Sequence, residues 1–254
     1  MDAIAPSART GGKLLALALP RKDRKQDTET VRLLRLGIGA VGVFLPAGLI
    51  AVNWARHFWQ HRAGFVIIPT SMSGSYWTTA RDVFVGSLCA IGVFLIGYRR
   101  TRLQDICSTV AGVCALLVAF NPTAPGPGTP GEPQWVNYLH HIAAGALLLT
   151  LGAFCFVFLA EYRGAGTSGR PAGIIYLTSG CAVIAAVTAA LITGLLGVGS
   201  NWPLLYLLEA IAVFCFGAAW ITASLDDQAG FPPPAQPAGS QASDPLPAGA
   251  ATAI

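Results

Sequence analysis

Long runs of apolar residues, separated by short connections, dominate the chain. A helix that crosses the hydrocarbon core of a bilayer needs about 20 consecutive, mostly apolar residues. Six segments meet this requirement. The backbone of a spanning segment must satisfy its own hydrogen bonds, and the runs lack the alternating pattern of barrel strands, so we predict helices. The predicted helices cover residues 31–53, 80–98, 103–120, 138–160, 173–196 and 203–223.

The composition also indicates a membrane protein. Of the 254 residues, 54% are hydrophobic and 11% are charged, whereas soluble domains carry about 25% charged residues. We therefore predict an all-α fold, a six-helix transmembrane bundle over residues 30–225, with disordered cytoplasmic termini. Residues 1–29 form a basic tail and residues 226–254 a Pro/Ala-rich tail, and neither tail can bury enough apolar surface to fold.

The positions of the Lys and Arg residues predict the orientation. Cytoplasmic connections of membrane proteins carry an excess of these residues. With a cytoplasmic N-terminus, only Arg56, Arg62 and Arg81 of the 16 basic residues face outside. Most basic residues flank apolar runs and do not form the basic surface that binds nucleic acid. We predict a multi-pass protein of the bacterial plasma (inner) membrane, with both termini cytoplasmic. Its expected partners are membrane lipids and not nucleic acid, and its protein partners stay open.

Ionisable side chains inside a membrane are costly, so each one is a candidate for a binding or catalytic site. In this chain they gather at the outer ends of the second, fourth and sixth predicted helices. Two serines of the first outer loop lie at a similar level. The candidate ligand-binding residues are Ser71, Ser73, Arg81, Asp82, His140, His141 and Glu209.

Two interpretations of this outer cluster stay open. In the first, the three helices form an outward-facing polar pocket, roofed by the first loop, which binds a lipid or small molecule or hydrolyses it by acid–base chemistry. In the second, the protein is a non-enzymatic structural or accessory protein, and the cluster ties helix ends together. Neighbouring helix residues point about 100° apart, so at most one residue of each adjacent pair can face a given point. Glu209 lies too deep to reach the headgroups easily, so we expect it to pair with Arg81 or a histidine, or to have a raised pKa.

The chain carries no strong catalytic motif. Gly-x-Ser-x-Gly, Walker A and His-Glu-x-x-His are all absent from the sequence. No spacing of ligands indicates a structural metal site, so we expect neither a metal nor a cofactor. The absence of motifs favours a non-enzyme, and a membrane-embedded hydrolase is the enzymatic alternative.

One stretch of sequence resembles a known group of membrane proteins. Residues 71–86 read S-M-S-G-S-Y-W-T-T-A-R-D-V-F-V-G and precede a hydrophobic helix and a basic turn. This run resembles a bacterial family of uncharacterised six-helix membrane proteins. It is more distantly similar to the FRAG/DRAM/Sfk type, in which a Ser-containing outer loop also leads into the second helix. The resemblance implies a role in lipid handling or membrane organisation, and it marks Ser71, Ser73, Arg81 and Asp82.

Overall fold

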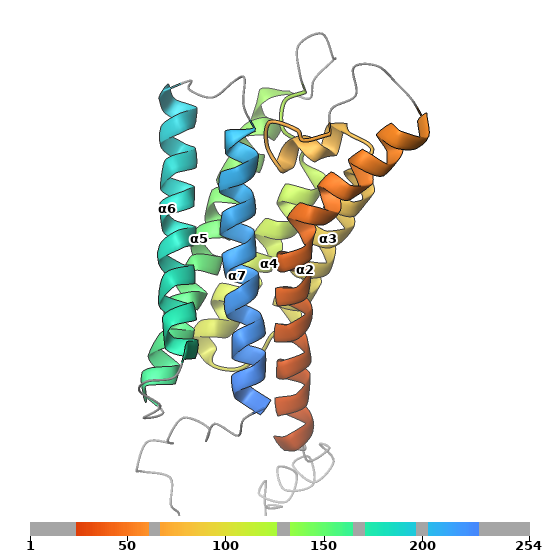
Figure 1. Cartoon of the computed structure of the whole chain (residues 1–254). Helices are drawn as coiled ribbons and strands as arrows, with labels where there is room; N and C mark the ends of the chain where they lie inside the picture. Colours follow the sequence, from red (N-terminus) through yellow and green to blue (C-terminus); the bar gives the residue numbers. More distant parts are fainter. Residues whose placement is uncertain (1–23, 61–66, 126–132, 165–170, 197–202, 229–254) are drawn as a thin grey trace, which may run out of the picture.

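The described part of the chain is helical throughout. The computed structural model describes residues 24–60, 67–125, 133–164, 171–196 and 203–228 (Figure 1). These residues form six α-helices and one short 3-10 helix, and no strand occurs among them, which confirms the predicted all-α six-helix bundle. The predicted disordered termini lie mostly outside the described residues. In chain order, the elements are α2 (Arg24–Gln60), η1 (Ser73–Trp77), α3 (Arg81–Gly97), α4 (Arg102–Phe120), α5 (Gln134–Gly164), α6 (Pro171–Leu196) and α7 (Leu204–Gln228).

The first and last helices are longer than predicted. α2 begins at Arg24, inside the segment assigned to the basic tail, and α7 runs to Gln228, beyond the predicted boundary at residue 225. A helix can continue with polar residues where it leaves the membrane, so the apolar run underestimates its length. In α7 the extra turn is also held in place, because the Tyr176 hydroxyl donates a hydrogen bond to the Asp226 carboxylate at 2.5 Å.

Five of the described helices, α2, α4, α5, α6 and α7, are long and apolar enough to cross a bilayer. α3 has 17 residues, or roughly 25 Å at 1.5 Å per residue, and it packs between α2 and α4. Large apolar side chains face outward from the bundle, as at Phe44, Ile142 and Leu195, which are each more than two-thirds exposed. Such an apolar exterior suits lipid and not water.

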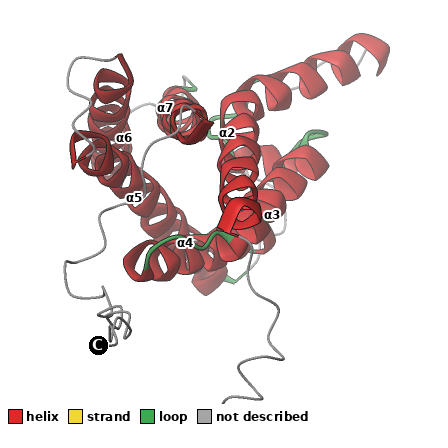
Figure 2. Ribbon diagram, turned by 90° about the horizontal axis from the view of Figure 1, so that it is seen from below, coloured by secondary structure: helices red, strands yellow, loops and turns green. Residues whose placement is uncertain are grey.

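The helices form a closed ring. Each helix packs against the next one in the sequence, and α2 packs along α7 to close the ring. α5 also contacts α7, so α6 lies outside this pair, while the other five helices surround the bundle axis (Figure 2). The ring has two ends. We call the end that carries η1 the η1 end, and the end where α2 begins and α7 finishes the terminal end.

Glycines bring the first and last helices of the ring together. A Cβ atom on Gly39 would lie 2.8 Å from the carbonyl oxygen of Gly217, and one on Gly217 would lie 2.7 Å from that of Gly39. No side chain fits at either position without moving a backbone. Small residues at such contacts let membrane helices pack without a hydrophobic driving force from water.

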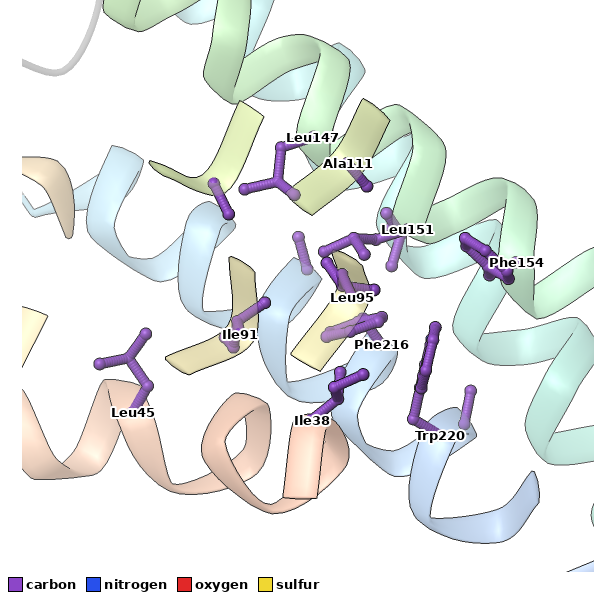
Figure 3. Packing of buried hydrophobic residues seen from close by; sticks show 14 of the residues in the cluster. Ile38, Leu45, Ile91, Leu95, Ala111, Leu147, Leu151, Phe154, Phe216 and Trp220 are labelled. Atoms are coloured by element: carbon purple, nitrogen blue, oxygen red, sulfur yellow. The ribbon is translucent and has the colours of Figure 1, made fainter. Parts of the chain in front are cut away.

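Aromatic side chains fill the half of the ring nearest the terminal end. The Trp220 ring is fully buried, and its centroid lies 5.2 Å from that of Phe154 and 5.5 Å from that of Phe216 (Figure 3). Phe158 also lies within 5.3 Å of Trp220. These edge-to-face and tilted contacts are those that aromatic rings favour, and they close the centre of the ring at this level.

α2 bends at its proline. The helix continues through Pro46, and beyond that level it leans away from the bundle (Figure 1). Proline removes one backbone donor and its ring crowds the preceding turn, which is the usual cause of a kink. The Tyr206 hydroxyl of α7 donates a hydrogen bond to the Pro46 carbonyl at 2.6 Å, so the bend stays attached to the ring.

Candidate functional site

The loop between α2 and α3 covers the η1 end of the ring. The Tyr206 N–H of α7 donates to the Thr70 carbonyl at 3.0 Å. The side chain of Asn53 in α2 makes two further links. Its Nδ2 donates to the Ile67 carbonyl at 3.3 Å, and its Oδ1 accepts from the Thr79 hydroxyl at 3.0 Å. The described residues 67–80 between α2 and α3 thus form a roof attached to both α2 and α7.

Glu209 holds the roof at its centre. Its carboxylate accepts a hydrogen bond from the Met72 N–H at 2.5 Å, and the Ser73 N–H also donates to it. These two N–H groups begin η1, and the first N–H groups of a helix have no partner within it. Of the alternatives expected for Glu209, neither Arg81 nor a histidine pairs with it, because backbone groups of the roof occupy that carboxylate.

Ser73 and His140 form a second link between the roof and the ring. The Ser73 hydroxyl lies 3.0 Å from Nε2 of His140, and Nδ1 of His140 lies 2.6 Å from the Asn121 carbonyl oxygen. Both side chains are buried. A carbonyl oxygen only accepts, so Nδ1 must carry a proton. In the neutral ring Nε2 then has a free lone pair and accepts the hydrogen bond of Ser73.

A narrow cavity lies directly under the roof. Its volume is about 60 Å³, which is room for several water molecules at roughly 10–15 Å³ each. The lining residues of α5 run from Ala144 to Leu151, or roughly 10 Å along the axis, so the cavity is elongated. Ser73 and Glu209 provide its polar end. The other lining residues are apolar: Leu45, Met72, Phe84, Leu88, Ile91, Val118, Ala144, Leu147, Leu148, Leu151, Val213 and Phe216.

Arg81 and Asp82, two of the predicted site residues, lie outside this assembly. Both are exposed, and the Arg81 guanidinium donates to the Tyr76 hydroxyl at 2.6 Å and covers the Tyr76 ring at 4.2 Å. Ala80, just before α3, and Phe84 are buried on the inward face, so Arg81 and Asp82, which lie between these positions, point away from the ring axis. The structure therefore does not bring Arg81 or Asp82 to the cavity.

His141 and Ser71 also stay apart from the cavity. His141 is exposed, and its Nδ1 lies 2.7 Å from the Asn137 carbonyl oxygen one turn earlier. The Ser71 hydroxyl accepts a hydrogen bond from the Gly74 N–H at 2.9 Å and thereby shapes the entry to η1. Of the seven predicted residues, Ser73 and Glu209 line the cavity, and His140 joins them through its hydrogen bond with Ser73.

A second buried polar group, which the sequence did not single out, lies at the terminal end. We call it the arginine cluster: Arg35, Tyr98, Gln104 and Glu161. The Arg35 guanidinium donates twice to the Tyr98 hydroxyl, at 2.9 and 3.2 Å, and lies 3.7 Å from Glu161. The Tyr98 hydroxyl in turn donates to the Gln104 side chain at 2.9 Å. Burial raises the pKa of Tyr98 above its ordinary value, and the nearby Arg35 charge opposes that shift only in part.

The cavity presents a hydroxyl and a carboxylate at one end of an apolar space, and the imidazole of His140 is hydrogen-bonded to that hydroxyl. Within the described ranges, no three His, Cys, Asp or Glu residues come close enough to hold a metal ion. The cavity's apolar lining with a few polar groups is typical of small-molecule sites, while its volume is smaller than the roughly 300–1,000 Å³ of such sites.

The fold is that of a multi-pass helical membrane protein with a cavity beneath the segment that carries η1. Comparison of the chain with known protein families, with curated proteins and with solved structures finds no match.

Proposed function

We propose that the protein binds a short stretch of the hydrocarbon chain of a membrane lipid or a related amphiphile in the cavity beneath η1. The cavity supports this proposal most directly. It is elongated and apolar along the bundle axis, and it meets polar side chains only at the roof. A molecule with an apolar chain and a polar end matches this distribution, because burying the chain is favourable and the polar end finds hydrogen-bond partners at Ser73 and Glu209.

We also propose that the η1 end faces the outside of the cell and that the membrane is a bacterial plasma membrane. The first helix begins and the last helix ends at the terminal end, so both termini lie on one side of the membrane in this proposal (Figure 1). Arg99 and Arg100 lie at the terminal end as well, as expected for a cytoplasmic face. The site would then receive its ligand from the outer leaflet. The resemblance to six-helix proteins of lipid handling agrees with this proposal.

Photo-crosslinking tests the binding proposal. The purified protein is irradiated with octanoic acid that carries a diazirine on its chain, and the modified peptides are identified by mass spectrometry. We expect crosslinks on the cavity-facing residues Leu147, Leu148 and Leu151. Ala144 lines the cavity, so Ala144→Leu fills part of it and is expected to reduce these crosslinks at least tenfold.

Gly145 provides the matched control. A Cβ atom at Gly145 would have no neighbour within 4 Å, so Gly145→Leu adds an equally large side chain to the same helix without entering the cavity. This variant should be crosslinked as the parent is. Crosslinks that are spread over the lipid-facing residues of the bundle, or that resist Ala144→Leu, would refute binding in the cavity.

The alternative is a non-enzymatic accessory protein in which the buried polar groups only fasten the roof. The two backbone hydrogen bonds of Glu209 favour this reading, because they use the carboxylate to hold η1 in place. In that case no crosslinks gather in the cavity, while variants of Glu209 lower stability.

A further inference from the structure

We propose that Ser73 is a nucleophile that His140 activates, and that the cavity presents it with the acyl group of a lipid ester. This proposal depends on the binding function proposed above and adds a reaction to it. The site is thereby assigned to acyl-ester hydrolysis.

The geometry of the two side chains carries the inference. A serine is a weak nucleophile until a base within about 2.6–3.2 Å removes its proton, and a third group must orient that base. The Ser73 hydroxyl lies 3.0 Å from Nε2 of His140, within this range. The Asn121 carbonyl oxygen lies 2.6 Å from Nδ1 and fixes the proton there. His140 therefore presents its unprotonated nitrogen to the serine, as a general base must.

The surroundings of the pair give its substrate class. Ser73 belongs both to this hydrogen-bonded pair and to the lining of the cavity. The space next to it is apolar and narrow, and Phe84, Leu88 and Leu147 form part of its wall. An ester whose acyl chain enters this space places its carbonyl carbon near the roof, at the level of Ser73.

The reaction balances as follows. The Ser73 oxygen bonds to the carbonyl carbon of the ester while its proton moves to Nε2 of His140. The carbon–oxygen bond to the alcohol then breaks, and the alcohol leaves with the proton from Nε2. Water attacks the acyl-serine, His140 takes a proton from this water, and the Ser73 oxygen leaves and regains a proton. The net change is ester plus water to carboxylic acid plus alcohol.

Covalent labelling with an active-site probe tests the proposal. The full-length protein in detergent is treated with octyl fluorophosphonate, which phosphonylates an activated serine and releases fluoride, and the labelled residue is located by peptide mass spectrometry. We expect one label on Ser73. Hydrolysis of 4-nitrophenyl octanoate should be lost on labelling.

The chain offers matched control variants. Ser75 is buried on the same short helix but does not line the cavity, so Ser75→Ala should label as the parent does, whereas Ser73→Ala should not label at all. His140→Gln retains a hydrogen-bonding side chain without a base, and we expect a labelling rate at least 100-fold lower, in line with the loss of a general base. The exposed neighbour variant His141→Gln should keep the parent rate. Thermal unfolding followed by tryptophan fluorescence confirms that each variant is folded.

The outcomes separate the two proposals. Crosslinking of the diazirine probe in the cavity, without phosphonylation of Ser73, overturns the nucleophile and leaves lipid binding in place. Labelling that is the same in His140→Gln overturns the role of His140 as the base. If neither probe reacts in the cavity, both proposals fail.

Discussion

The two ends of the ring bury polar groups in opposite ways. At the terminal end, the Arg35 guanidinium lies 4.7 Å from the Phe158 ring centre, donates to the Ala223 carbonyl, and is surrounded by packed aromatic rings. At the η1 end, Ser73 and Glu209 border a cavity. A polar group enclosed by close packing can only hold the structure together, whereas one beside an empty space can also contact a ligand. The arginine cluster is therefore a structural element, whereas the polar groups beneath the roof border the space in which we propose that a ligand binds.

Among the variants that compare the two ends, replacement of Arg35 should cause the largest loss in the free energy of unfolding. Arg35→Ala removes a buried guanidinium that donates two hydrogen bonds to the Tyr98 hydroxyl and one to the Ala223 carbonyl. The Ala223 carbonyl then loses that donor. We expect a loss of about 3–5 kcal/mol in the free energy of unfolding, as for other buried charged groups whose partners stay behind. Thermal or denaturant unfolding in detergent measures it. The control, Arg32→Ala, breaks an ion pair with Glu29 at the helix start and should cost less than about 1 kcal/mol.

A larger side chain should have different effects on stability in the two halves of the ring, and this difference is the second largest that we expect. Ala219 is fully buried in the terminal half, and overpacking a filled core costs about 1–3 kcal/mol. Ala144 borders the cavity, so its new side chain has space. We expect Ala219→Leu to lower the unfolding temperature clearly and Ala144→Leu to leave it unchanged within about 0.5 kcal/mol. Equal losses in the two variants would show that the η1 half is as tightly packed as the terminal half.

Neutralising Glu209 should have a smaller and more local effect. In Glu209→Gln an amide oxygen can still accept from the Met72 N–H, but hydrogen bonds to a charged group are roughly twice as strong. We expect a loss of about 1 kcal/mol, seen as faster hydrogen exchange at the amides of Met72 and Ser73. Asp82→Asn changes an exposed carboxylate and should leave exchange in η1 unaltered. A uniform rise in exchange across all helices would contradict a local role in the roof.

The smallest expected effect is a dependence of the free energy of unfolding on pH, which arises from Tyr98 at the terminal end. Tyr98 has a raised pKa in the folded protein, while an unfolded chain releases this proton near pH 10.0. Above that pH the unfolded state binds fewer protons than the folded state, so stability is retained below pH 10 and falls as the pH rises further. Unfolding midpoints at pH 9 and 11 measure the fall. Tyr98→Phe should show a smaller difference between the two midpoints. If the difference equals that of the parent, the fall in stability comes from other groups.

The sequence was sufficient for the helices and for part of the site. Apolar runs of spanning length predicted all six helices, because the bilayer imposes both length and composition on them. The spacing of apolar residues along α5 also indicates which of the two adjacent histidines faces the inside of the bundle. Val136, His140, Ala143 and Leu147 follow one helical face, and all four are buried, so His140 and not His141 faces inward.

The remaining contacts depend on tertiary structure. The partners of Glu209 are backbone N–H groups of a loop 137 residues earlier, and no side-chain pattern marks a backbone donor. Ser73 meets His140, which follows it by 67 positions in the sequence, only because η1 folds over the ring. The arginine cluster was missed for a related reason. In the sequence, Arg35 is one of the basic residues near the first helix that predict the orientation. Its partner Tyr98 follows a different helix, so no local pattern links the two.

Closure of the ring by α2 and α7 also determines the order in which the fold can be completed. Proteins are synthesised from the N-terminus, so α2 enters the bilayer long before the glycine surface of α7 is available to it. Until α7 arrives, Gly39 faces lipid, Arg35 lacks the Ala223 carbonyl, and the roof lacks the Glu209 carboxylate. The last helix to be made thus completes the packing, the polar contacts and the cavity together, and a chain interrupted before it presents an unfinished polar surface to the quality control of the membrane.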